Sequence, residues 1–265
     1  MRQVGTGIVF EGRAFTTIGT SGVVFAHTSE PHIDPKGRVH TFCCAVPGCW
    51  HVMGVTQAAG LSLRWFRDNL AESYKDKAVR LGVDSYDLIN EDVAKVPIGS
   101  RRLIYLPYLM GERTPHLNPT SRGVFFGLSA IQSKADMLRA VMEGVSYSLL
   151  DCFDILREMK INVKEMMACG GGGKSRIWRQ MLADMYGCEV KTIKAQEGPA
   201  LGVAILAGVG AGIFPDVQTA CKDFIEQDTW CQPDAAAHAY YEKGHALYQK
   251  LYRQLKDCYE DLAAL

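Results

Sequence analysis

The chain has 265 residues, of which 48% are hydrophobic and 22% are charged, so it can bury a sizeable core and is globular, not disordered. Its 29 basic residues balance its 29 acidic residues, which gives no indication of nucleic acid or an anionic membrane as a partner. Nine scattered cysteines without a Cys-x-x-Cys pair indicate reduced thiols in a cytoplasmic protein, and argue against a disulfide framework or a zinc site.

The N-terminal part of the chain is dense in β-strand signals. Apolar, β-branched runs separated by short glycine turns predict consecutive hairpins, with strands over residues 8–10, 14–18 and 23–25. A loop is expected to follow over residues 28–38. The other elements expected in this half are a strand over 39–45, a helix over 56–70, a helix near 86–93, and β-like runs over 102–109 and 123–128 on either side of the polar loop 111–116.

Helical periodicity dominates the second half. Residues 134–159 carry one apolar stripe at helical spacing, and residues 234–262 carry a stripe of tyrosines and leucines that predicts a long C-terminal helix. A strand is expected around residues 189–193. The most apolar stretch, residues 198–214, is marginal for a membrane span and rich in Gly and Ala, so it predicts a buried helix that packs closely through small residues. The N-terminus has no apolar run of signal-peptide length.

A run of four glycines, residues 170–173, is the most informative segment. It precedes Lys174 and Ser175 as in a phosphate-binding P-loop, but that pattern needs a glycine where this chain has Ala168. An apolar run before the glycines and a helical pattern from Ser175 onward predict a strand, a glycine turn and a helix. Two interpretations stay open: the bare backbone N–H groups face a ligand, or glycine is needed only for a tight turn.

Two further glycine turns have the same character. Residues 18–22 place the hydroxyls of Thr20 and Ser21 in a predicted hairpin turn, and residues 58–60 begin a predicted helix. Each turn is weak evidence by itself. Several such turns that converge on one ligand are a known way to bind the phosphates of a nucleotide.

Five segments together carry a resemblance that covers nearly the whole chain. The chain is similar to the FGGY family of carbohydrate kinases, and the segments follow the order found in that family. Within the family, the Gly-Glu-Arg-Thr-Pro-His loop at 111–116 points to the members that phosphorylate D-xylulose. The five segments are residues 14–22, 105–116, 122–128, 170–184 and 198–204.

The resemblance implies a fold. It is the α/β, ribonuclease-H-like domain shared by actin, the sugar kinases and the Hsp70 ATPase, with a mixed sheet flanked by helices and a long C-terminal helix. Residues 1–265 would form a single domain, the C-terminal, nucleotide-binding half of an FGGY kinase. The N-terminal domain, which supplies most sugar contacts in the family, has no counterpart in this sequence.

The resemblance also implies a nucleotide site. Gly19 and Thr20 correspond to the turn that contacts the phosphates, and Gly60 and Arg64 correspond to residues one helical turn apart that flank the nucleotide. The residues that correspond to the motif beside the ribose and adenine are Gly170, Gly171, Gly172 and Ser175. ATP is the implied cofactor, with Mg²⁺ carried by the nucleotide and not by a protein metal site. Lys174 is then expected to be a surface lysine.

No catalytic residue is expected in the chain itself. The family's general base is an aspartate that would stand just upstream of residue 1, and the first acidic residue here is Glu11, in a predicted turn. A sugar hydroxyl is a weak nucleophile, and a positioned base that removes its proton contributes about 10²–10⁴-fold to the rate. We therefore expect the chain to bind ATP without phosphorylating D-xylulose on its own.

Other readings remain open. The same family acts on gluconate, ribulose and glycerol, and sugar choice would depend mainly on the absent domain. A non-catalytic actin-fold binding module is an alternative from another class. The face that the absent domain would cover is expected to favour self-association into a homo-oligomer. Glu112, Arg113 and His116 either contribute to the sugar kinase site or form a loop held by a Glu–Arg pair.

Overall fold

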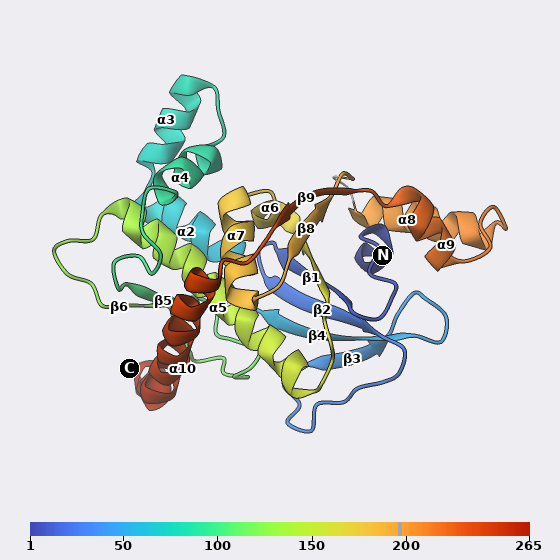
Figure 1. Cartoon of the computed structure of the whole chain (residues 1–265). Helices are drawn as coiled ribbons and strands as arrows, with labels where there is room; N and C mark the ends of the chain where they lie inside the picture. The colour runs from blue at the N-terminus through green and yellow to red at the C-terminus, as the bar shows by residue number, and fades with distance from the viewer. Residues whose placement is uncertain (196–197) are drawn as a thin grey trace.

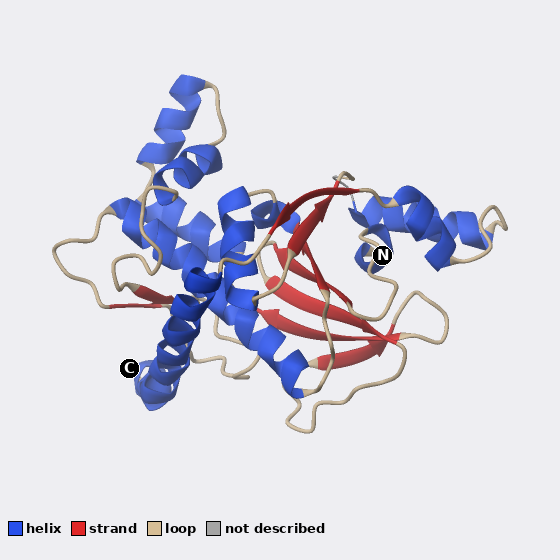
Figure 2. Ribbon diagram, viewed as in Figure 1, coloured by secondary structure: helices blue, strands red, loops and turns tan. Residues whose placement is uncertain are grey.

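The computed structural model describes residues 1–195 and 198–265, and it consists of a seven-stranded mixed sheet with helices packed around it (Figure 1). Figure 2 shows this sheet as one twisted layer, with a separate two-stranded sheet at the left of the view, beyond the intervening helices. The strand order is β3-β4-β2-β1-β7-β8-β9, and the small sheet is β5-β6. The strands are β1 (Arg13–Ile18), β2 (Gly22–Thr28), β3 (His40–Cys43), β4 (Trp50–Thr56), β5 (Ile104–Leu106), β6 (Val124–Phe126), β7 (Glu165–Cys169), β8 (Val190–Ile193) and β9 (Gln227–Cys231).

The centre of the sheet joins distant parts of the chain. Strand β1 pairs antiparallel with β2, as the hairpin pattern predicts, and parallel with β7, with Thr17 opposite Cys169. Parallel strands end at the same edge of a sheet. The β1–β2 turn at residues 19–21 and the glycine run that begins at Gly170 therefore lie beside each other.

The two faces of the sheet pack against different clusters. Ala14 and Ile18 of β1 point into the main core, which includes the buried face of α5, whereas Phe15 points to the other face and stacks on Phe25 with ring centroids 4.6 Å apart. This alternation is what a strand buried on both faces requires. The helices are α1 (Arg2–Gly5), α2 (Gly60–Leu70), α3 (Ser73–Leu81), α4 (Ser85–Val93), α5 (Lys134–Glu158), α6 (Gly170–Gly173), α7 (Arg176–Tyr186), α8 (Gly198–Gly210), α9 (Val217–Phe224) and α10 (Ala235–Ala263).

The long helices occupy the positions that their periodicity predicts. Helix α5 begins with a capping box, in which Ser133 and Asp136 bond each other's backbone N–H groups. Helix α10 packs on α5 and α7 and then runs on to the C-terminus at the lower left of Figure 1. Its tyrosine stripe is buried at Tyr241, Tyr248 and Tyr252, which confirms a docking face.

Helix α8 packs against α1 through small residues, as expected, although its outer side is exposed, with Val203 49% accessible. A Cβ atom at Gly5 would lie 1.6 Å from the carbonyl oxygen of Gly198, and one at Gly202 would lie 2.1 Å from that of Met1. The two backbones thus approach at distances that only glycine allows. Together with α9 these helices form a small cluster beside the N-terminus (Figure 1).

Several sequence predictions were wrong or incomplete. Residues 8–10 do not form a strand. They follow α1 and the positive φ of Gly7, and their backbone pairs with no strand of the sheet. The side chains of Ile8 and Val9 are nevertheless buried in two hydrophobic clusters. Strands β4 and β9 and helices α3 and α9 were not anticipated. The polar β9 has four exposed residues out of five and therefore no apolar alternation to reveal it.

Candidate functional site

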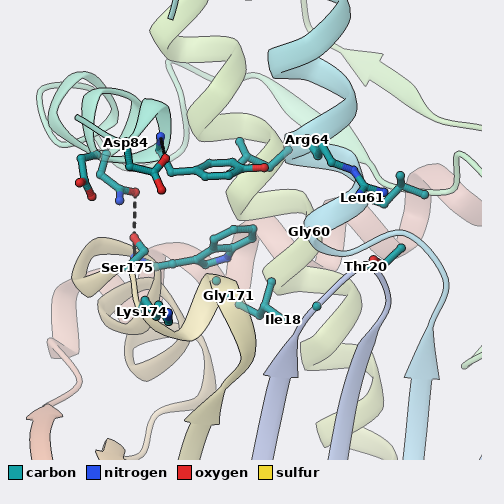
Figure 3. Close-up of a pocket in the computed structure, with 16 residues that line it drawn as sticks. Ile18, Thr20, Gly60, Leu61, Arg64, Asp84, Gly171, Lys174 and Ser175 are labelled. Atoms are coloured by element: carbon teal, nitrogen blue, oxygen red, sulfur yellow. Dashed lines mark hydrogen bonds between the residues drawn. The ribbon is translucent and has the colours of Figure 1, made fainter. Parts of the chain in front are cut away.

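A cavity of about 430 Å³ opens where the β1–β2 turn, the start of α2, helix α4 and the glycine run meet (Figure 3). All of the predicted nucleotide-binding residues except Gly170 line it. Because four separate segments form its walls, the cavity depends on the tertiary fold. The lining residues are Ile18, Gly19, Thr20, Gly60, Leu61, Leu63, Arg64, Asp84, Tyr86, Asp87, Asn90, Gly171, Gly172, Lys174, Ser175 and Trp178.

The β1–β2 turn is locked onto the first turn of α2. The Gly60 N–H donates to the Gly19 carbonyl at 2.7 Å, and the Thr20 carbonyl accepts from the N–H groups of Ala59 and Leu61. A Cβ atom at Gly60 would lie 2.5 Å from the Gly19 oxygen, so this contact requires glycine. The exposed side chain of Arg64 lies one turn further along α2, on the rim of the cavity (Figure 3).

The glycine run forms the opposite wall. It forms the single helical turn α6 instead of an open loop, and its first residue, Gly170, has a φ of 78° that is strained for other residues. Arg179 holds this turn in place, because its Nη1 donates to the carbonyls of Gly173 at 2.8 Å and Lys174 at 2.9 Å. A Cβ atom at Gly171 would meet nothing within 4 Å beyond its chain neighbours and its own helical turn, so its backbone is open to the cavity.

Gly170 and Lys174 show where this wall ends. Gly170 faces away from the cavity, toward a second one of about 500 Å³ on the side of α1 and α8. Lys174 is exposed, as expected for a surface lysine, and it lies on the rim of both cavities.

Ser175 caps helix α7 and bridges it to α4. Its Oγ accepts from the Trp178 N–H at 3.3 Å and donates to Oδ1 of Asn90 at 2.8 Å, the bond drawn in Figure 3. The buried Trp178 donates its Nε1–H to Ser146 at 3.0 Å and lines the cavity floor. The two sides of the cavity are therefore joined through Ser175.

Helix α4 is the part of the site that sequence reasoning missed. A helix near residues 86–93 was expected, but nothing local connects it with the glycine turns. The signal lies in its spacing, because Tyr86, Asp87 and Asn90 share one face while Leu88 and Ile89 are buried on the other. Asp84, the N-cap of α4, completes this wall.

The Gly-Glu-Arg-Thr-Pro-His loop lies outside the cavity, and the predicted Glu–Arg pair does not form. Buried Glu112 accepts from the hydroxyls of Thr56 and Ser148 and from two backbone N–H groups, whereas the Arg113 side chain contacts His40. Burial raises the pKa of Glu112 to about 7. His116 stacks on a tyrosine of α10, and burial lowers its pKa to about 4.

Residues 14–211 match the family described as the C-terminal domain of the FGGY family of carbohydrate kinases. The chain belongs to this family. A xylulose kinase from Staphylococcus epidermidis is 36% identical over 262 residues, which cover 99% of this chain and 51% of that protein. A gluconokinase from Bacillus subtilis is 36% identical over 265 residues, 99% of this chain and 51% of that protein. The chain thus spans about half the length of the curated relatives it matches.

Solved structures agree with the family and the fold. The ligand-bound xylulose kinase from Lactobacillus acidophilus superimposes with a TM-score of 0.86 at 28% identity, over 98% of this chain and 51% of that one. The glycerol kinase from Plasmodium falciparum solved with ADP, at 19% identity and a TM-score of 0.80, covers 96% of this chain and 49% of that one and shares the fold. The predicted actin-like sugar kinase fold is confirmed.

Two features are absent from residues 1–195 and 198–265. No helix there combines the length and apolar character needed to cross a membrane. No group of three or more His, Cys, Asp or Glu side chains there is arranged to hold a metal ion.

Proposed function

We propose that this chain is the ATP-binding half of a carbohydrate kinase that converts D-xylulose and ATP into xylulose 5-phosphate and ADP. The observation that carries the proposal is convergence: Gly19 and Thr20, Gly60 and Arg64, and Gly171, Gly172 and Ser175 come from three separate segments and line one cavity. The several relatives that are xylulose kinases support the choice of sugar.

The shape of the cavity suggests how the nucleotide lies. Its apolar floor, which includes Ile18 and Trp178, suits a flat base, and the open backbone at Gly171 suits the ribose beside it. Thr20 lies on the other side of the cavity (Figure 3), in a turn, and its hydroxyl, which bonds to none of the described residues, suits the phosphates. Mg²⁺ would enter with the phosphates, whose oxygens supply most of its ligands in phosphoryl-transfer sites.

We further propose that these 265 residues alone do not transfer phosphate. The carboxylates that line the cavity, Asp84 and Asp87, both belong to the α4 wall, and Figure 3 shows Asp84 across the cavity from Thr20. A base must reach the sugar hydroxyl at the phosphate end. The base and most sugar contacts would therefore come from another domain.

Two measurements test this proposal. Calorimetric titration of the 265-residue chain with MgATP and MgADP should show binding, and a coupled assay for ADP release with D-xylulose should show no turnover. Failure to bind either nucleotide would refute the proposed site. Steady turnover by the chain alone would refute the need for a second domain.

Gluconate is a second candidate substrate. The gluconokinase of Bacillus subtilis is as similar in sequence as the first xylulose kinase, and the gluconate kinase of Lactobacillus acidophilus superimposes with a TM-score of 0.84 at 28% identity. The two sugars differ in that gluconate carries a carboxylate. Assays of D-xylulose, gluconate, ribulose and glycerol with the full gene product distinguish the candidates by kcat/KM.

A further inference from the structure

The hydroxyl of Ser175 is fully committed to the protein as a donor. It accepts the Trp178 N–H as the N-cap of α7, and its single proton goes to Oδ1 of Asn90. A serine hydroxyl has only one proton, so Ser175 cannot also donate to a nucleotide base. A base that needs a donor at this wall must find it on another group.

The side chain of Asn90 carries such a group. Because Oδ1 accepts from Ser175, the amide is oriented with Nδ2 as its other group, and Nδ2 carries two donor N–H bonds. Throughout the described chain, Nδ2 has no hydrogen-bond partner, although Asn90 is half-buried and lines the cavity. A half-buried donor that lines a cavity is suited to a ligand acceptor.

The surroundings of Asn90 suit a flat aromatic ligand. Tyr86 lines the same wall one turn earlier, and its ring is held by Arg67, whose guanidinium carbon lies 4.6 Å from the ring centroid. Trp178 donates its Nε1–H to Ser146, so its side chain has no donor left for the cavity. Apolar and aromatic walls bind a base by burial and stacking, and the Asn90 amide is a donor on the same wall that can contact the edge of the base.

We propose that Asn90 determines base specificity by donating a hydrogen bond from Nδ2 to an unprotonated ring nitrogen of a purine. The role that the family resemblance gives to Ser175 is thereby divided: Ser175 orients the amide, and Asn90 contacts the base. This inference rests on the proposed function, in which the cavity holds a nucleotide.

The test combines one substitution with nucleotide analogues. Asn90→Asp keeps an oxygen for the Ser175 hydroxyl but removes the donor, and 1-deaza-, 3-deaza- and 7-deaza-ATP each lack one ring nitrogen. The wild-type chain should bind ATP about 3- to 10-fold more tightly than one of these analogues, the range expected for one hydrogen bond. In Asn90→Asp this preference should disappear. Asn162→Asp, an exposed asparagine outside the cavity, should retain it.

The possible outcomes are distinguishable. Equal binding of ATP and all three analogues by the wild type overturns the inference and leaves ATP binding standing. A uniform loss for Asn90→Asp, with the preference intact, means that Asn90 only supports Ser175, and also overturns it. If no nucleotide binds to the wild type, the proposed function fails too. Thermal melting checks the fold, and Asn90→Ala repeats the measurement if Asn90→Asp melts early.

Discussion

The absence of a side chain at Gly171 should matter for ligand binding and not for the stability of the fold. A Cβ atom there would touch nothing within 4 Å beyond its chain neighbours and its own helical turn, and the residue lines the cavity. Gly171→Ala should therefore change the unfolding free energy by less than about 1 kcal/mol. It should weaken ATP binding about tenfold, because the methyl group occupies space that the nucleoside uses. Calorimetry and urea denaturation measure the two quantities.

Gly210 provides the matched control for Gly171. It is also helical, with open space around it, but it lies in α8 and outside the cavity. Gly210→Ala should leave ATP binding unchanged. If Gly171→Ala binds ATP as tightly as Gly210→Ala does, the nucleoside does not approach the glycine run. The run would then be only a structural turn.

Between α1 and α8, glycine serves packing and not a ligand. A Cβ atom at Gly5 would lie 1.6 Å from the carbonyl oxygen of Gly198. Because this is far shorter than any van der Waals contact, Gly5→Ala must push the two helices apart. We expect a loss of roughly 1–3 kcal/mol in the unfolding free energy, the usual cost of overpacking. Urea denaturation of Gly5→Ala, compared with that of the control variant Gly210→Ala, measures this loss. Equal stability of the two variants would show that α1 shifts freely.

Helix α10 should depend on its tyrosine stripe and not on its length. Tyr248 is fully buried, accepts a hydrogen bond from Tyr108 at 2.8 Å and lies 5.4 Å from the ring of Tyr147. Tyr248→Ala should lower the unfolding free energy by about 3–5 kcal/mol, as for other buried aromatic residues. Leu247, the next residue, is 41% exposed, and Leu247→Ala should cost less than about 1 kcal/mol. Similar losses of unfolding free energy for Tyr248→Ala and Leu247→Ala would contradict the conclusion that the tyrosine stripe is the docking face.

Elements with a strong local pattern could be predicted from the sequence, and those held by their neighbours could not. Helical periodicity predicts α5 and α10, and glycine turn residues between β-branched runs predict the β1–β2 hairpin. Strand β4 carries a strand signal in its aromatic and β-branched residues. Strand β9 has none, because its pairing with β8 gives exposed polar residues their conformation.

At the scale of the whole molecule, the site could be predicted only as separate fragments. Thr20, Gly60 and Gly171 each stand out by their glycine turns, and a family resemblance was needed to group them. Their meeting depends on the parallel pairing of β1 with β7, strands separated by more than half of the chain. Asn90 carries no local signal of a ligand contact, since it reaches the cavity only through the packing of α4.

Two buried groups, Glu112 and His116, should make the unfolding free energy of the whole molecule depend on pH in opposite directions. The pKa of Glu112 is raised from 4.5 to about 7 by burial. Between these values the folded chain holds a proton that the unfolded chain releases, so this stabilisation is complete below pH 4.5 and lost as the pH rises to about 7. The pKa of His116 is lowered from 6.5 to about 4, so its contribution is lost as the pH falls through that range.

Glu112→Gln isolates the first of these contributions, because the amide is neutral at every pH. From pH 4.5 to 7.5, the unfolding free energy of the wild type should fall relative to that of Glu112→Gln by about 3 kcal/mol, since each pKa unit corresponds to about 1.4 kcal/mol. Urea denaturation at several pH values measures both curves. Glu72→Gln, which alters an exposed carboxylate, should run parallel to the wild type. Parallel curves for Glu112→Gln and the wild type would show that the four donors around Glu112 keep it ionised when buried.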